Sequence, residues 1–284
     1  MNWELDWPVG RAGVAVVSPS GTETAFLGGV TGGDRFEVAS VTKLMTSLAA
    51  LAAVSSGRLG LDDPVPQAVQ AGGGEGVTVR HLLAHAGGFP FEPPGRARPP
   101  AQRRIYSNVG FRILAEAVAD AVGTSFAGWL SSSVLDPLGM SSTELVHRRG
   151  IDGDPAAGAS STLDDLARLA RCLLDGGAPV VGPDLFAEAT TVQFPGLAGL
   201  VPGVGRFDPC DWGLGFELHD GKRPHWMGDR RSPAAFGHFG ATGCFLGVDP
   251  DAGRAAAAVT DRAFDDGKWG MATWPAWSDR LPDA

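Results

Sequence analysis

The sequence predicts an α+β fold: one antiparallel β-sheet built from both chain ends and flanked by helices, with an inserted, mostly helical domain. Three observations favour it. Two β-rich runs surround a turn near the N-terminus, and a second such pair lies near the C-terminus. Between them, apolar residues recur at helical rather than strand spacing. Strands at opposite ends of a chain form one core most simply by pairing in a single sheet.

The first predicted elements are a hairpin and a helix. Residues 13–17 and 22–27 surround Ser18-Pro19-Ser20-Gly21, a sequence typical of a turn. Residues 41–56 are predicted to form a helix that ends at Gly57. Further helices are expected at 78–85, at 109–122, at 126–134 and from Ser161-Thr162 onward, where one stripe contains Leu163, Leu166, Leu169, Ala170 and Leu173.

The last third of the chain returns to strand patterns. Residues 213–218 alternate as in a strand, and 241–248 and 254–260 flank the turn 249–253. We therefore expect a discontinuous sheet domain from residues 1–60 and 205–284. A mostly helical domain, 61–204, would be inserted into it, with the active site between the two.

Composition excludes several classes of protein. The 284 residues contain 23 Lys+Arg and 32 Asp+Glu, a net charge of −9, which disfavours nucleic-acid or membrane partners. The three cysteines are an odd number without a Cys-X-X-Cys motif, so neither a disulfide scaffold nor a zinc ribbon is expected. The N-terminus lacks signal-peptide character, and the most apolar run, 44–54, is too short to span a bilayer. These features predict a cytoplasmic protein, and they do not determine its oligomeric state.

The motif Ser40-Val41-Thr42-Lys43 is the first candidate for chemistry. Residues three apart on a helix share a face, so the lysine amine can reach the serine hydroxyl. A helix N-terminus also offers free N–H groups that favour an alkoxide. Alone, the motif fits an N-cap serine beside a solvated lysine equally well. The chain has only three lysines among its 23 basic residues, and lysine, unlike arginine, can lose its proton when desolvated.

Tyr106-Ser107-Asn108 contains the single tyrosine of the chain, just before a predicted helix. A phenol can relay a proton, and the Asn amide can hold a carbonyl or position the lysine. A core tyrosine beside a helix-capping Asn is the alternative.

The glycine-rich run 237–243 is the third candidate. Its small residues allow a substrate to pair with the backbone as an extra strand. The N–H groups of Ala241 and Ser40 could together form an oxyanion hole. A β-bulge is the structural alternative.

Taken in this order, the three motifs resemble the serine β-lactamase and penicillin-binding-protein superfamily, in the branch of class C β-lactamases, D,D-carboxypeptidases, D-aminopeptidases and β-lactamase-like carboxylesterases. The surrounding sequence is similar along nearly the whole chain. Matching segments are 36–39, 57–64, 79–85, 136–140, 157–168 and 212–216.

The resemblance implies a role for each residue. Ser40 is the acylated nucleophile, Lys43 its general base, and Tyr106 the shuttle that protonates the leaving group and later activates water. Asn108, His238, Gly240 and Ala241 bind the substrate. The expected substrates are small esters, amides or β-lactams, without a metal or other cofactor.

His238-Phe239-Gly240 stands where β-lactamases of the family have Lys-Thr-Gly. Histidine, with an ordinary pKa near ~6.5, is mostly neutral at pH 7 and becomes charged only toward pH 6. It therefore offers a substrate carboxylate little attraction. We expect a carboxylesterase or amidase, with a β-lactamase or a D,D- or D-amino-peptidase as the alternative.

Two other interpretations compete. His81 and His85 have metal-ligand spacing, but the His-Glu-X-X-His pattern is absent. A binding or sensor module that kept only the fold is the rival from another class, although such a module would normally have lost Ser40, Lys43 or Tyr106.

Overall fold

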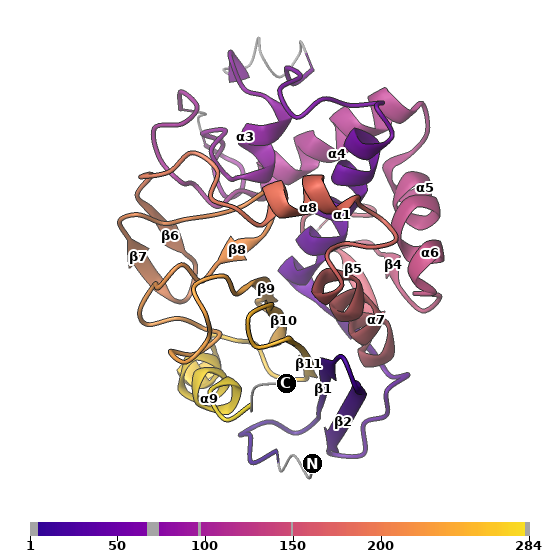
Figure 1. Cartoon of the computed structure of the whole chain (residues 1–284), viewed down its shortest axis with the longest axis vertical. Coiled ribbons are helices and arrows are strands. Elements are labelled where there is room, and N and C mark those ends of the chain that lie inside the picture. Colours follow the sequence, from indigo (N-terminus) through magenta and orange to yellow (C-terminus); the bar gives the residue numbers. More distant parts are fainter. Residues whose placement is uncertain (1–4, 67–73, 96–97, 149, 282–284) are drawn as a thin grey trace.

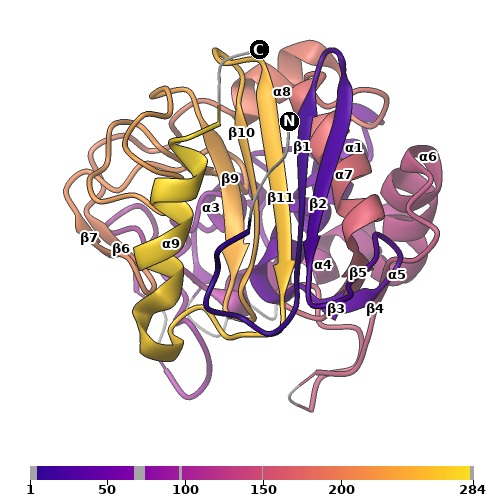
Figure 2. The same cartoon turned by 90° about the horizontal axis from the view of Figure 1, so that it is seen from below.

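The computed structural model describes residues 5–66, 74–95, 98–148 and 150–281. Its largest sheet has six antiparallel strands in the order β2-β1-β11-β10-β9-β8 (Figures 1 and 2). The strands are β1 Ala12–Ser18, β2 Gly21–Leu27, β8 Glu217–Leu218, β9 Phe236–Gly240, β10 Cys244–Asp249 and β11 Arg254–Thr260. Because β1 pairs with β11, both chain ends build this sheet, which confirms the predicted fold class.

The two predicted hairpins, β1-β2 and β10-β11, are confirmed. Side chains along a strand point alternately to opposite faces, so each strand contributes to two cores. In β1, Ala15 and Val17 belong to the larger core, whereas Val14 and Val16 belong to a second core on the other face.

Helices cover both faces of the sheet. α7 (Leu163–Leu174) packs on β1, β10 and β11, while α9 (Trp269–Ser278) lies on the opposite face (Figure 2). α1 (Thr42–Ser55) packs against α4 (Asn108–Val122) and is almost entirely buried. The other described helices are α3 Val79–Leu83, α5 Phe126–Leu130, α6 Asp136–Leu138 and α8 Pro183–Ala189, with short 3₁₀ helices at η1 Ala39–Val41 and η4 Asp266–Lys268 and a π-helical segment at η3 Ser131–Leu135.

Two small sheets complete the described structure. β3 (Arg35–Glu37) pairs with β5 (Ala159–Thr162), which pairs with β4 (Glu144–Leu145). β6 (Gly199–Val201) and β7 (Gly205–Phe207) form a separate hairpin.

Two predicted elements are wrong in extent. The strand expected at 213–218 is reduced to Glu217–Leu218, because Gly215 has a φ of +90° and the chain bends there. The helix expected at 126–134 ends at Leu130 and continues as the π-helical segment η3. The division into two domains stays a prediction; α7, from the inserted segment, packs on the sheet.

One bent pair of helices has the length and composition of a membrane-spanning segment. Over the described ranges, no single helix has both the length and the apolar character to cross a bilayer. The segments Asn108–Val122 and Phe126–Leu138, bent by 79° from each other, qualify together on length and composition only.

Candidate active site

Ser40 lies in the tight turn η1 that leads into α1. The preceding Ala39 has a φ of +45°, a left-handed conformation that costs a non-glycine residue ~1–3 kcal/mol and is typical of functional turns. Val38 N–H donates to the Ala159 carbonyl at 3.0 Å and anchors the turn to β5. On the other side, a Cβ at Gly240 would lie 2.3 Å from the Val38 carbonyl oxygen, so only glycine lets β9 approach this closely.

Lys43 follows one helical turn later and is fully buried. Its Nζ donates to Asn108 Oδ1 at 2.5 Å and to the Ala156 carbonyl at 2.8 Å. The same nitrogen lies 4.7 Å from the centre of the Tyr106 ring and 5.3 Å from that of Phe111. A neutral amine has two N–H bonds to donate, so these two acceptors leave its lone pair free to accept a proton.

Burial lowers the pKa of Lys43 from 10.5 to about 7. The Asp154 carboxylate opposes this pKa shift, and the Arg112 guanidinium reinforces it. At neutral pH a large share of the molecules therefore carries an uncharged amine three residues from Ser40, as a general base requires.

A charged network behind Lys43 positions its partners. Asn108 Nδ2 donates to Glu92 Oε1 at 2.8 Å, so both ends of this amide are engaged. Arg112 bridges two carboxylates, with Nη1 2.5 Å from Glu92 Oε2 and Nη2 3.1 Å from Asp154 Oδ2. Asp154 Oδ1 in turn accepts from Ala156 N at 3.0 Å. Asn108 thus contacts the lysine, as one reading of the sequence allowed, and its binding of substrate stays a prediction.

Tyr106 lies against the Lys43 amine and four aromatic rings, one of which is Phe91 at a ring-centre distance of 5.8 Å. Ring-centre distances are 4.6 Å to His85, 5.8 Å to Trp212 and 5.6 Å to His238. Burial raises the pKa of Tyr106 well above its ordinary value, although Ser40 is close enough to oppose this shift. The Tyr106 hydroxyl makes no hydrogen bond of normal geometry with the described residues and is available to a reacting group.

His238 is buried in β9. Its Nδ1 lies 2.7 Å from the Phe239 carbonyl oxygen, which only accepts, so Nδ1 carries the proton and Nε2 is an acceptor. That Nε2 is buried and finds no partner in the described part of the chain. Burial and the nearby Lys43 charge lower the pKa of His238 to about 3. The imidazole is therefore neutral at pH 6 as well as at pH 7, and the expected gain of charge toward pH 6 is wrong.

Ser40, Tyr106, His238 and Ala241 line one cavity of about 80 Å³. Its other walls are largely apolar and include Phe91, Val201, Pro202, Trp212, Phe239 and Phe264. The charged side chains lining it are two carboxylates, the buried Glu217 and the exposed Asp265. The structure thus brings the predicted site residues together. Four of them line the cavity, and the other three, Lys43, Asn108 and Gly240, lie directly behind its wall.

Glu217 belongs to a buried ionic cluster. Lys222 Nζ lies 2.8 Å from its Oε1, and His225 Nε2 and Trp226 Nε1 lie 2.8 Å from its Oε2. Burial alone would raise the pKa of Glu217, but the contacts with His225 and Lys222 hold it well below its usual range. The carboxylate therefore stays ionised at the edge of the cavity.

Sequence reasoning missed Glu92, Arg112, Asp154 and Glu217. Nothing in their spacing marks them, because they come from two separate loops, from α4 and from β8. Sequence reasoning also missed the concentration of arginines just before Tyr106, which can be seen in the sequence itself. Four arginines stand in the nine residues 96–104, directly before Tyr106.

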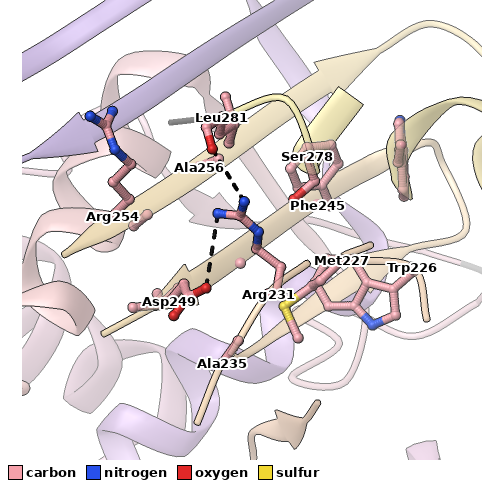
Figure 3. A pocket seen from close by; sticks show the side chains of 14 residues that line it. Trp226, Met227, Arg231, Ala235, Phe245, Asp249, Arg254, Ala256, Ser278 and Leu281 are labelled. Carbon is pink, nitrogen blue, oxygen red and sulfur yellow. Dashed lines mark hydrogen bonds and ion pairs between the residues drawn. The ribbon is translucent and has the colours of Figure 1, made fainter. Parts of the chain in front are cut away.

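A separate cavity of about 30 Å³ lies between α9 and the sheet (Figure 3). Arg231 reaches from one wall, with Nη1 3.9 Å from Asp249 Oδ2 and Nη2 donating to the Leu281 carbonyl at 3.2 Å. It shares no lining residue with the Ser40 cavity and has room for about one water molecule.

The two histidines with metal-ligand spacing have structural contacts. His81 closes the capping box of α3 with Thr78, and its ring stacks on Phe194 at 4.4 Å. His85 Nδ1 accepts from Ser107 N at 3.1 Å. Within the described ranges, no group of three or more His, Cys, Asp or Glu side chains is arranged to hold a metal ion.

Known proteins resemble this chain over most of its length. The Beta-lactamase family profile matches residues 8–274. A crystal structure of a beta-lactamase from Mycobacterium bovis is 43% identical, covers 96% of this chain and 94% of its own, and superposes with a TM-score of 0.86. Simvastatin synthase from Aspergillus terreus, at 16% identity, shares the fold with a TM-score of 0.78 over 95% of this chain and 90% of its own.

Among curated proteins, penicillin-binding protein 4* of Bacillus subtilis is 29% identical over 140 residues, which is 40% of this chain. The match spans 31% of that relative, so about a third of its length aligns with this chain. The profile match and the M. bovis structure cover nearly all of the chain. The chain therefore belongs to the beta-lactamase family of serine hydrolases.

Proposed function

We propose that the protein hydrolyses small carboxylic esters or amides through an acyl-enzyme on Ser40. The observation that carries the proposal is the complete burial of Lys43, whose Nζ donates to Asn108 and Ala156 and whose pKa is lowered to about 7. A lysine in this state accepts a proton from the serine at neutral pH, whereas an ordinary lysine cannot.

Each step has a group within the site. Ser40 Oγ attacks the carbonyl carbon while its proton passes to Lys43 Nζ, and the N–H groups of Ser40 and Ala241 bind the oxyanion. The Lys43 ammonium returns the proton through Tyr106 to the leaving group, and the C–O or C–N bond breaks. Water then attacks the acyl-enzyme by the same proton route in reverse and releases the acid.

The charges around the cavity support esters or amides over β-lactams. A β-lactam carries a carboxylate close to the scissile bond, but here the neighbouring His238 is neutral and the charged lining groups are Glu217 and Asp265. Attraction for a carboxylate at this position is therefore weak. The likeness to a beta-lactamase from M. bovis favours β-lactam hydrolysis as the second candidate.

A side-by-side assay separates these candidates. We expect turnover of a short-chain nitrophenyl ester and little turnover of a chromogenic cephalosporin, and turnover of a D-amino-acid amide would show that the substrates include amides. Mass spectrometry after treatment with a phosphonate inhibitor should place the adduct on Ser40. An adduct on Ser107 or Ser161 would overturn the nucleophile assignment. Absence of both turnover and labelling would favour a non-catalytic binding module.

Efficient cephalosporin turnover at pH 8, where His238 is neutral, would reverse the ester preference in favour of the second candidate. Prolonged chelation should leave hydrolysis unchanged, since no step uses a metal. A loss that zinc restores would contradict the proposal.

A further inference from the structure

A second, larger groove opens beside the Ser40 cavity. Its volume is about 580 Å³, within the ~300–1,000 Å³ typical of small-molecule sites. It shares the lining residues Phe91, Tyr106 and Pro202 with the Ser40 cavity, so the two adjoin. The other walls come from residues 98–105, before Tyr106, and from 198–208, which include the β6-β7 hairpin.

The groove concentrates positive charge in an acidic protein. Arg98, Arg103 and Arg206 line it, are exposed, and have no ion pair or hydrogen bond with any described side chain. The acidic residue lining it is Asp208. Several arginines elsewhere in the chain, which has a net charge of −9, pair with carboxylates, as in the Arg80–Asp62 and Arg112–Glu92 contacts.

Arg104 adds a buried cation to the groove floor. Its guanidinium donates to backbone carbonyl oxygens at 3.0 Å (Cys210), 2.6 Å (Ala84) and 2.7 Å (Gln193). No carboxylate among the described residues forms an ion pair with it, so the charge contributes to the potential of the groove. Burial lowers the pKa of Arg104 to about 10, which still leaves it charged at neutral pH.

The same residue makes the groove rigid. Arg104 N–H donates to the Ala198 carbonyl at 3.0 Å, and the two wall segments meet in a bridge between Arg104 and Gly199. A Cβ at Gly199 would lie 2.5 Å from Arg104 Cβ, so glycine is needed for this approach. A preformed groove binds a ligand with little cost of ordering.

Apolar side chains accompany the charges. The large hydrophobic residues that stand out as exposed in the described chain are Phe26, Phe91 and Leu200, and two of them line this groove. Phe91 is 47% and Leu200 is 46% exposed. A groove that combines unpaired guanidinium groups with exposed apolar side chains suits an amphipathic anion.

We propose that this groove binds the anionic end of an extended substrate, a carboxylate or phosphate joined by an apolar linker to the ester or amide held at Ser40. The inference rests on the proposed function and defines its substrate class. In this arrangement the scissile bond lies near the neutral His238, and the guanidinium groups of the groove bind a negative charge farther along the substrate.

Binding to the Ser40→Ala protein tests the groove independently of hydrolysis. Calorimetry would compare monomethyl suberate with dimethyl suberate, and hexyl phosphate with hexanol. We expect the anion of at least one pair to bind about tenfold or more tightly than its neutral partner at ~0.01 M salt. This preference should shrink at ~0.15 M salt, because exposed charges are screened. A preference in one pair only identifies the anion as a carboxylate or a phosphate.

Substitutions locate the effect. R98Q/R103Q/R206Q, made together in the Ser40→Ala protein, should remove most of the preference, and replacement of the same three by lysine should retain part of it. Arg230→Gln is the matched control: Arg230 is exposed, lies outside both cavities, and its side chain has no partner among the described residues. It should change nothing.

The active enzyme gives a second measurement. The ratio of kcat/KM for the nitrophenyl monoester of suberate to that for its methylated, neutral counterpart should exceed about ten and approach one in the triple glutamine variant. Equal binding of both members of both pairs, or an unchanged preference in that variant, would overturn the groove assignment. Failure to hydrolyse any ester, with anion binding to the Ser40→Ala protein intact, would instead overturn the proposed function.

Discussion

Lys43 combines complete burial with hydrogen bonds that a neutral amine can donate. With the unprotonated lysine as the proposed base, kcat/KM for an ester should rise with pH and reach half its plateau near pH 7, where the pKa of Lys43 lies. Lys43→Arg keeps a positive charge that cannot be given up and should abolish acylation, whereas the exposed Lys268→Arg should not. Retention of most activity by Lys43→Arg would reduce Lys43 to an electrostatic role.

The same lysine should make stability depend on pH. Between about pH 7 and 10.5, Lys43 is neutral in the folded protein but still charged in the unfolded chain, which binds more protons. The free energy of unfolding therefore rises with pH in this window, by up to ~1.4 kcal/mol per pH unit, and this term levels off below pH 7. Urea unfolding of the native protein and of Lys43→Met should diverge accordingly. Parallel pH profiles would contradict a depressed lysine pKa.

The charge at position 238 determines how strongly the site attracts a substrate carboxylate near Ser40. A lysine there would add a charge-assisted hydrogen bond of ~1.5–3 kcal/mol, or roughly ten- to a hundredfold in kcat/KM. We expect His238→Lys to shift the ratio of cephalosporin to ester hydrolysis by that factor, and the neutral His238→Gln not to. The ratio in the native enzyme should be the same at pH 6 and pH 8, because the pKa of His238 is about 3. A twofold or larger increase toward pH 6 would show that the imidazole titrates.

At the scale of elements, charged residues on α4 and on the loops that contain Glu92 and Asp154 shift the pKa of Lys43. Arg112 on α4 holds Glu92 and Asp154, and Asp154 raises the pKa of Lys43. Asp154→Asn retains an oxygen for the Ala156 N–H but removes the charge, so the rising limb of the pH profile should move to lower pH. Arg112→Gln should move it to higher pH, because two carboxylates then lie near the lysine uncompensated.

These opposite shifts distinguish an electrostatic role from loss of structure, which would lower the plateau without moving the limb. Arg112→Lys, which keeps the positive charge, is the matched control and should leave the limb near pH 7. Shifts of the same sign in Asp154→Asn and Arg112→Gln would contradict this account.

For the whole molecule, α9 closes the second core. Trp274 is buried against Phe245 and Phe264 at ring-centre distances of 4.7 Å and 5.0 Å. Trp274→Ala should cost ~3–5 kcal/mol of unfolding free energy, and a Tm decrease of about 6 °C or more follows for a chain of this size. Phe26→Ala, which truncates an aromatic side chain that is 42% exposed, should change Tm by less than about 2 °C. Similar losses in thermal unfolding would mean that α9 contributes no more than surface contacts.

Local patterns account for what was predictable. The hairpins β1-β2 and β10-β11 follow from alternation around turn residues, and α4 follows from its apolar stripe and from Gly123, which ends the helix at a φ of +75°. The error at 213–218 has an equally local cause, since the alternation there is interrupted by a glycine in the left-handed region. Helical spacing also placed Lys43 one turn from Ser40.

By itself, the sequence determined the α+β class, the order of the motifs and the residues offered for chemistry, because period-2 and period-3.6 patterns act over a few neighbours. Only the tertiary structure decided the burial and the protonation state of these residues. Lys43 has a lowered pKa because the fold buries it, with hydrogen bonds to Asn108 and Ala156, 65 and 113 residues away. His238 is neutral because the fold buries it near Lys43. The groove lined by Arg98, Arg103 and Arg206 exists because the segments 98–105 and 198–208 lie side by side. Burial and charge depend on distances in space, and one-dimensional spacing does not contain them.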